Sequence, residues 1–213
     1  MGAAIASSIA VGAGALALVF SSGSSTAPAL RPAGEGTDRA TRVSSSATRF
    51  GGAREDCSTR SEANFPGAFT SPRNLVVGPL VLIGGAYTDP STVREFGGNK
   101  FPLLVKAGHI VTVRLARRGR RAAGLGYGPH PQGELKLRDT YRSVTFVACR
   151  PGRASRRYSP NGPSESYADG AAVTFWSGFV LTRAPACIPL DIYVDDASSP
   201  RRVGLALGRR CGE

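Results

Sequence analysis

The chain has 213 residues, which is enough for one domain and a tail. Its 27 basic residues against 15 acidic ones give a net charge of +12, which bears on association with anionic partners and not on the fold. Arginine supplies 24 of the basic residues, and Gly and Pro together number 42, so codon bias of a GC-rich genome is an alternative origin of the charge.

The N-terminus carries an apolar segment. Residues 3–20 contain no charge, and a stretch of small residues with the pattern Ala27-x-Ala29 follows. This order predicts a secretory signal peptide over residues 1–29. The segment lacks a basic residue before the apolar run, and its length is at the lower edge for a membrane-spanning helix, so a retained membrane anchor is the alternative. Either way, we expect the rest of the chain to be extracytoplasmic, secreted or anchored.

Residues 30–56 form the next segment. They are rich in Ser, Gly and Arg and show no apolar periodicity. Such a segment buries too little apolar surface to offset the entropy of ordering, which predicts a disordered linker. The folded domain is expected over residues 57–213.

Short apolar runs separated by turn residues characterise that domain. They predict strands over residues 74–83, 101–108, 109–116, 121–128, 141–149, 171–182, 189–195 and 202–208. Pro79 lacks a backbone donor, so a bulge or a sheet edge is expected there. No stretch combines sustained helical spacing with caps. The pattern predicts an all-β fold, an antiparallel β-sandwich of seven or eight strands.

Alternation along these strands gives the expected core. It contains Val76, Leu80, Leu82, Val111, Val113, Val144, Phe146, Phe175, Phe179, Leu190, Ile192 and Leu205. Trp176 lies on the face opposite Phe175 and Phe179, so both a core position and an exposed binding-face position stay open for it.

Four cysteines occur without a C-x-x-C pair: Cys57, Cys149, Cys187 and Cys211. An even number on an exported chain favours disulfides over metal binding, and no metal or cofactor is expected. Cys187 and Cys211 flank an expected terminal hairpin. Pairing Ile192 with Leu205 would point these two cysteines to opposite faces, which a bulge at Gly208 would correct. The expected bonds are therefore Cys187–Cys211 and, by elimination, Cys57–Cys149.

Signals for catalysis are sparse, and no catalytic residue is assigned. His130 lies between two prolines and is a candidate general base, but no G-x-S-x-G nucleophile motif accompanies it. His109 is expected to be a polar residue at the start of a strand. The glycines of "GLGYG" at residues 124–128 are interpreted as structural. Asp195 and the neighbouring acids are expected to pair across the turn with Arg201 and Arg202.

Two arginine clusters are the candidate anion-binding residues: Arg117, Arg118, Arg120 and Arg121, and Arg153, Arg156 and Arg157. If both lie at one end of the sandwich, they form an anion-binding rim; solvated, codon-driven arginine is the other interpretation, and the favoured one. The partners considered are an anionic cell-wall polymer or a membrane surface. Nucleic acid is not expected, because no binding motif for it is present.

The stretches "NLVVGPL", "KAGHIVTVRL", "VTFVAC" and "FWSGFVLTRAPACIPLDIYVDD" resemble those of uncharacterised exported β-rich proteins of high-GC Gram-positive bacteria, over residues 57–211. The resemblance implies an exported location and a β-rich fold, and it implies no activity. The expected function is a non-enzymatic, exported or membrane-tethered binding domain of the cell envelope. The alternative is an extracytoplasmic hydrolase that uses His130.

Overall fold

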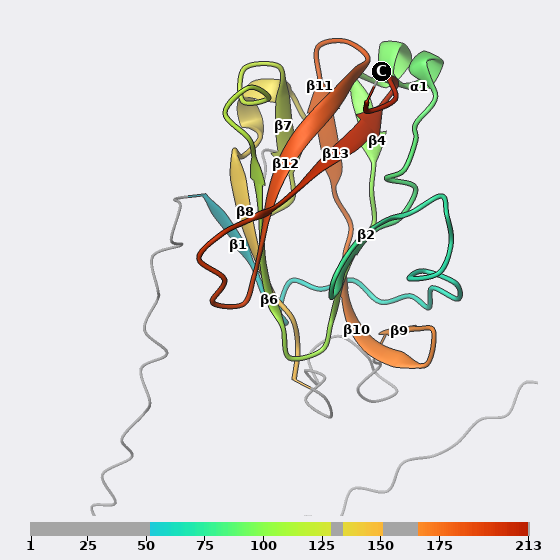
Figure 1. Cartoon of the computed structure of the whole chain (residues 1–213), viewed down its shortest axis with the longest axis vertical. Coiled ribbons are helices and arrows are strands. Elements are labelled where there is room, and N and C mark those ends of the chain that lie inside the picture. Colours follow the sequence, from blue (N-terminus) through green and yellow to red (C-terminus); the bar gives the residue numbers. More distant parts are fainter. Residues whose placement is uncertain (1–51, 129–133, 151–165, 213) are drawn as a thin grey trace, which may run out of the picture. The chain divides into compact units, whose positions relative to one another are not determined.

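The computed structural model describes residues 52–128, 134–150 and 166–212, which form an all-β fold with one short α-helix (Figure 1). The predicted fold class is confirmed. The segment predicted as a signal peptide or anchor, residues 1–29, and residues 30–51 of the predicted linker lie outside the described residues. Within the described residues, no helix is both long and apolar enough to cross a membrane.

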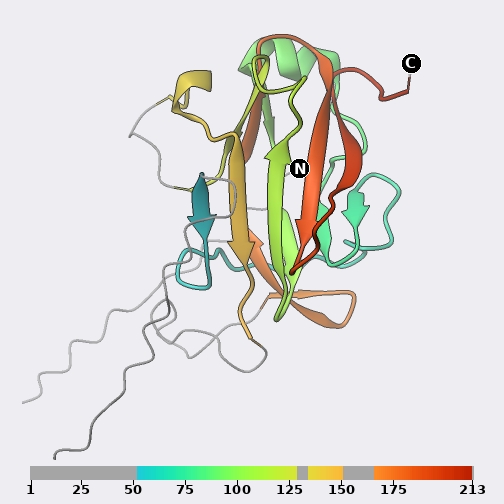
Figure 2. The same cartoon turned by 60° about the vertical axis from the view of Figure 1, so that its left-hand side comes forward.

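One layer of the sandwich is a five-stranded sheet, sheet A, seen face-on in Figure 2. Its strand order is β1 (Ala53–Glu55), β8 (Ser143–Val147), β6 (Ile110–Leu115), β12 (Ala186–Val194) and β13 (Arg201–Leu207). The pairs are antiparallel except for β1 and β8, which are parallel.

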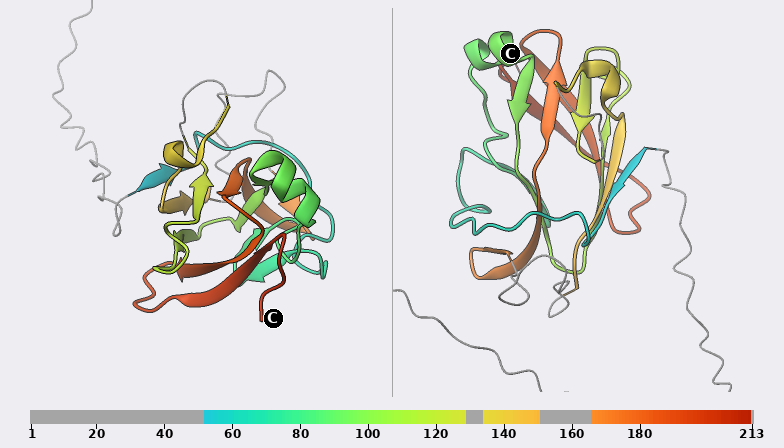
Figure 3. Two further views of the ribbon diagram at one scale, coloured as in Figure 1. Left: turned by 90° about the horizontal axis from the view of Figure 1, so that it is seen from above. Right: turned by 180° about the vertical axis from the view of Figure 1, so that it is seen from behind.

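The opposite layer consists of two sheets. Sheet B has the order β2 (Leu75–Val77), β3 (Leu80–Leu82), β5 (Leu103–Lys106), β10 (Ala171–Trp176) and β9 (Ser166–Ala168). Sheet C has the order β4 (Gly98–Lys100), β11 (Phe179–Thr182) and β7 (Ala123–Gly126). The chain passes between sheets B and C from β3 through α1 (Pro90–Phe96) to β4, and directly from β4 to β5 and from β10 to β11 (Figure 3).

The break between β10 and β11 corrects the prediction of one strand over residues 171–182. The chain leaves sheet B after Trp176 and enters sheet C at Phe179. Gly178 at the break accepts a hydrogen bond from the backbone N–H of Phe101, at 2.9 Å, and its missing Cβ makes room for the ring of Tyr127. Because these contacts join segments that are distant in sequence, the alternation of residues 171–182 could not predict the break.

The first predicted strand, residues 74–83, is a hairpin. Val77 pairs with Leu80, so Gly78 and Pro79 form a two-residue turn, and the φ of 59° at Gly78 suits its first position. The expected sheet edge is present, because β2 is an outer strand of sheet B. The proline lies in the turn and not in a bulge.

Helix α1 (Pro90–Phe96) is the element that the sequence prediction missed. The Asp89 side chain accepts a hydrogen bond from Ser91 N at 2.7 Å, and Gly97 ends the helix with a φ of 65°. Val93 is the one buried residue of α1, so the helix has no apolar periodicity to recognise. A second short element is the 3-10 turn η1 (Leu137–Asp139).

The main core lies between the two layers. All the predicted core residues are buried except Val76 and Phe179, which are 39% and 38% exposed. Trp176 is a core residue, since its ring packs beside Phe146 and its Nε1 donates to the carbonyl of Asp56 at 3.1 Å. Phe175 faces away from this core into a second cluster on the outer side of sheet B, where Phe65 covers it.

The folded part begins before the predicted boundary at residue 57. Strand β1 pairs with β8 from Ala53 to Glu55, so the end of the predicted linker belongs to the domain. Both end residues of β1 are buried. Three residues are too few for a detectable alternation of apolar and polar side chains. The prediction therefore places them in the linker, from the composition of the residues before them.

Both predicted disulfides are confirmed, Cys57–Cys149 and Cys187–Cys211, and they use all four cysteines. The predicted hairpin register is wrong, because Leu205 pairs with Ile188 and not with Ile192. Two features bring the sulfur atoms together. Gly208, with a φ of 78°, turns the chain back after β13, and Gly204 has no Cβ to meet the bond, which lies over it.

Candidate functional site

Four exposed arginines form the arginine surface, defined as Arg117, Arg118, Arg120 and Arg121. They lie in the loop between β6 and β7. The loop is fixed against sheet A, since Ala116 N donates to the carbonyl of β12 residue Pro189 at 2.9 Å and Gly119 is buried beside the same proline. Arg120 Nε also donates to the carbonyl of Leu115 at 3.2 Å. The positive charges are therefore presented on a held backbone.

More cations lie at the same end of the sandwich. Arg183 follows β11 and is exposed, and its backbone N–H donates to the carbonyl of Ala122 in the arginine loop at 3.1 Å. Arg209 and Arg210 follow β13, which ends opposite the start of β12. Arg210 also stacks on the ring of Tyr87, 5.2 Å from its centroid. None of these three forms an ion pair with a described carboxylate, and neither do the residues of the arginine surface.

The second predicted cluster, Arg153, Arg156 and Arg157, lies outside the described residues. The described chain enters that segment at Arg150 and leaves it at Ser166. Arg150 follows Cys149, whose carbonyl accepts from Gly108 N before β6 begins, whereas the arginine surface follows the end of β6. Arg150 is thus at the end of sheet A opposite the arginine surface, so the described residues do not form the expected shared rim.

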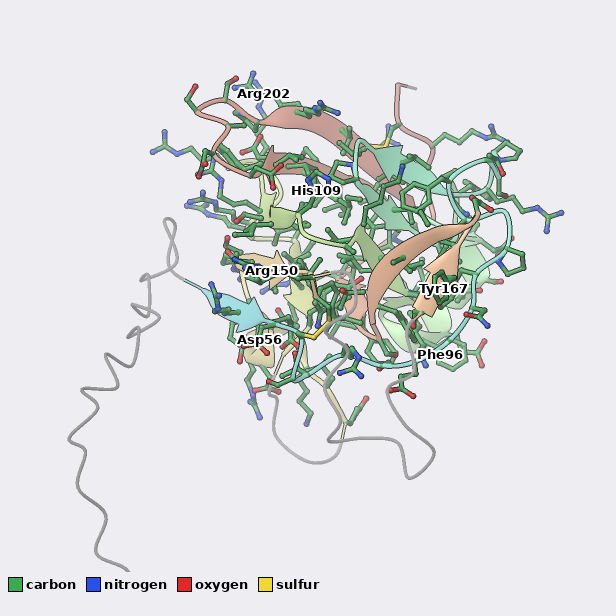
Figure 4. All side chains as sticks on the ribbon, turned by 90° about the horizontal axis from the view of Figure 1, so that it is seen from below. Asp56, Phe96, His109, Arg150, Tyr167 and Arg202 are labelled. Carbon is green, nitrogen blue, oxygen red and sulfur yellow. A yellow bond between two sulfur atoms is a disulfide. The ribbon has the colours of Figure 1, made fainter. Side chains whose placement is uncertain are left out.

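That opposite end, viewed in Figure 4, carries a His–Asp pair. His109 Nδ1 is 2.9 Å from Asp195 Oδ2, and Asp195 Oδ1 accepts from Ile110 N at 2.9 Å. The backbone hydrogen bond from Ile110 is the main reason that the pKa of Asp195 is lowered, and the contact with His109 adds to it. The sequence predicts that Asp195 pairs with Arg201 or Arg202. In the structure, Asp195 pairs with His109 instead.

The pair has the first half of a catalytic arrangement, because the carboxylate would hold the ring with its other nitrogen outward. No hydroxyl or thiol in the described part of the chain is hydrogen-bonded to that nitrogen. The described geometry orients His109 and stabilises a strand end. His130, the predicted candidate base, lies outside the described residues, and the hydrolase alternative stays a prediction.

The outer face of sheet A holds a buried ion pair. Arg114 of β6 donates to Asp191 of β12 at 3.0 Å and to the hydroxyl of Tyr193 at 2.6 Å. Arg202 of β13 approaches the other oxygen of Asp191 at 3.7 Å. The cross-turn pairing expected for the acids of residues 191–196 thus exists at Asp191. The cluster joins three neighbouring strands, and its location beside packed strands indicates a structural role.

A groove of about 930 Å³ lies on the outer side of sheet C. Phe179 and Leu181 of β11 form its floor, Phe96 of α1 is on one wall, and Leu135 and Leu137 are on the other. Phe96 is 66% exposed. Phe179 faces this groove and not the core because it shares the outer face with Phe175, whereas Trp176 and Val180 lie in the main core.

The glycines of β7 explain how the second wall is held. A Cβ on Gly126 would be 2.5 Å from Leu135, and one on Gly124 would collide with the side chain of Thr140. Residues 134–140 therefore pack directly onto the backbone of β7, which confirms that the "GLGYG" glycines are structural. The sequence prediction missed the groove, and its one local signal was the aromatic residue of the helix end "EFGGNK" at residues 95–100.

Glu55 is a buried carboxylate, 4% exposed on β1. Its Oε1 has no hydrogen-bond partner among the described residues. Burial is the main reason that the pKa of Glu55 is raised, while a hydrogen bond from Thr59 lowers it and the nearby charge of Asp56 raises it. The folded state therefore favours the protonated form.

Replacing Glu55 with Gln is expected to stabilise the protein at pH 7. The stabilisation that the protonated acid provides is complete below its unfolded pKa of about 4.3 and is lost as the pH rises through the higher folded pKa. A glutamine side chain does not ionise, so we expect the free energy of unfolding at pH 7 to rise by about 1–2 kcal/mol, with a smaller gain at pH 4. Urea unfolding at both pH values measures this. The exposed Glu95→Gln variant is the control, and an equal gain at both pH values would contradict the assignment.

Comparison with models of protein families, with curated proteins and with solved structures gave no significant match to this chain. The fold and the site therefore define the class of the protein by themselves. It is a β-sandwich with two disulfides, a basic end and an apolar groove beside that end.

Proposed function

We propose that the chain is a non-enzymatic binding domain of the cell envelope that holds an anionic polymer through the arginine surface. The observation that carries the proposal is the set of four exposed arginines on a loop fixed to β12, none paired with a described carboxylate. Because the loop backbone is held and these charges have no described carboxylate partner, an anion that binds them breaks no internal ion pair.

The two disulfides support the location. Bonds of this kind form and persist in oxidising compartments, and they are rare where thiols are kept reduced. The apolar residues 1–29 would export the domain and either be removed or stay as a membrane anchor. Secreted or anchored, the domain would meet polymers that carry phosphate or carboxylate groups, or the surface of the membrane.

The R117Q/R118Q/R121Q variant tests the proposal. Arg120 is kept because its side chain bonds the loop backbone. Each exposed charge contributes modestly and is screened by salt, so we expect the affinity for polyphosphate to fall about tenfold in 50 mM salt and the difference to shrink in 0.5 M salt. Isothermal titration with the full chain measures both.

The matched control is R54Q/R73Q/R150Q, which removes three exposed arginines away from the arginine surface. We expect it to change the affinity less than twofold. Equal losses in the two triple variants would show that only net charge matters, and the arginine surface would then be ordinary solvated arginine.

A further inference from the structure

The groove beside sheet C has no role in binding a polymer at the arginine surface, and we propose that it holds the hydrocarbon chain of a single-chain anionic lipid. The proposal rests on the groove alone and not on the proposed function. Large exposed aromatic residues are unfavourable on a free surface, and two of them, Phe96 and Phe179, meet here in one hollow.

The lining suits a hydrocarbon chain. The floor and both walls expose carbon from Phe96, Phe179, Leu181, Leu135 and Leu137. Its volume of about 930 Å³ is near the upper end for ligand sites, which leaves length for an extended chain. Each methylene group that leaves water for such a surface contributes about 0.8 kcal/mol.

The backbone of the groove disfavours a peptide strand. The floor strand β11 is hydrogen-bonded on both sides, to β4 from Phe179 to Leu181 and to β7 from Phe179 to Thr182. It offers no free edge to which a peptide could add. Asn99 on the rim already donates its side-chain amide to Thr88 at 3.1 Å. An occupant that lies along the floor therefore gains apolar contact and little backbone hydrogen bonding from β11.

The charge on the rim selects an anionic head group. Lys100, Lys136 and Arg183 line the groove against Glu95 and Glu134, an excess of one positive charge. Lys100 lies opposite Phe179, whereas Arg183 follows the other end of β11. Because Arg183 adjoins the arginine loop through its bond to Ala122, the head group is expected at the Arg183 end, with the chain extending toward Phe179.

Binding of dodecyl phosphate to the full chain, below its micelle concentration, tests the proposal by isothermal titration. We expect Phe96→Ser to weaken binding tenfold or more, because the ring forms one wall of the groove. The ring is 66% exposed, so it contributes little to the core and the variant should still fold. Arg183→Gln is expected to weaken it about threefold, and to leave the binding of the uncharged dodecyl maltoside unchanged. Tyr167→Ser is the matched control, since Tyr167 is an exposed aromatic residue of β9 outside the groove.

Four results would overturn the inference. Inorganic phosphate could bind as tightly as dodecyl phosphate, dodecyl phosphate could fail to bind, or Phe96→Ser could have no more effect than Tyr167→Ser. Sedimentation could also show that Phe96→Ser abolishes a dimer, which would make the groove an interface between copies. The R117Q/R118Q/R121Q variant is expected to bind dodecyl phosphate normally, so failure at the arginine surface and failure at the groove remain distinguishable.

Discussion

Replacing both Cys57 and Cys149 with Ala is expected to lower the free energy of unfolding by about 4–5 kcal/mol. The bond closes a loop with a sequence separation of 92, and without it the unfolded chain gains that freedom. The same bond holds the first strand, since Cys57 follows β1 and Cys149 follows β8. Asp56, whose carbonyl accepts from the indole of Trp176, lies directly beside it.

Urea unfolding followed by the fluorescence of the single tryptophan measures this effect, because Trp176 lies beneath the segment that the bond holds. The comparison is the double replacement of Cys187 and Cys211, whose separation of 24 predicts a smaller loss of about 3 kcal/mol. Equal losses would contradict the loop-entropy argument. Four free thiols in protein purified from its host would contradict export itself.

The strands and disulfides were predictable because their signals are local or can be counted. Alternation marked β6 and β8, with Val111 and Val113 buried on one face of β6. The even number of cysteines, none of them in a C-x-x-C pair, indicated two bonds. The register of β12 on β13 was not predictable from alternation, because shifts by an even number of residues keep the same faces inward. The observed register places Gly204 under the disulfide, where any other residue would put a Cβ against the two sulfur atoms.

The candidate site was predictable only where one segment forms it. Arg117 to Arg121 are consecutive in the chain and lie together for that reason. Whether they lie near the arginines that follow Cys149 depends on the direction of β6. The six residues of β6 place Arg150 and the arginine surface at opposite ends of sheet A. The groove required still more, because α1, β4, β11 and residues 134–137 are far apart in sequence. Phe179 was expected in the core because alternation gives two faces but does not show which of them the opposite layer covers, and here Trp176 and Val180 face inward.

The second large effect is expected for Asp191→Ala, a loss of about 3 kcal/mol in the free energy of unfolding. Asp191 is 7% exposed, and its Oδ2 is 3.0 Å from Arg114 Nη2. The variant removes this counter-ion from a guanidinium group whose side chain is 21% exposed and packs over the ring of Tyr193. Burying a charge without its carboxylate is costly, whereas removing an exposed charge is not.

Arg202→Gln provides the matched control for that variant, because Arg202 contacts the same carboxylate at 3.7 Å from a side chain that is 85% exposed. We expect a loss below about 0.5 kcal/mol. Urea unfolding in 0.1 M and 1 M salt measures both variants, and the loss in Asp191→Ala should persist in high salt because a buried pair is weakly screened. Similar small losses in the two variants would contradict the burial argument. The pair lies two residues along β12 from Pro189, on which the arginine loop rests, so polyphosphate binding by Asp191→Ala would show whether its loss also reaches the arginine surface.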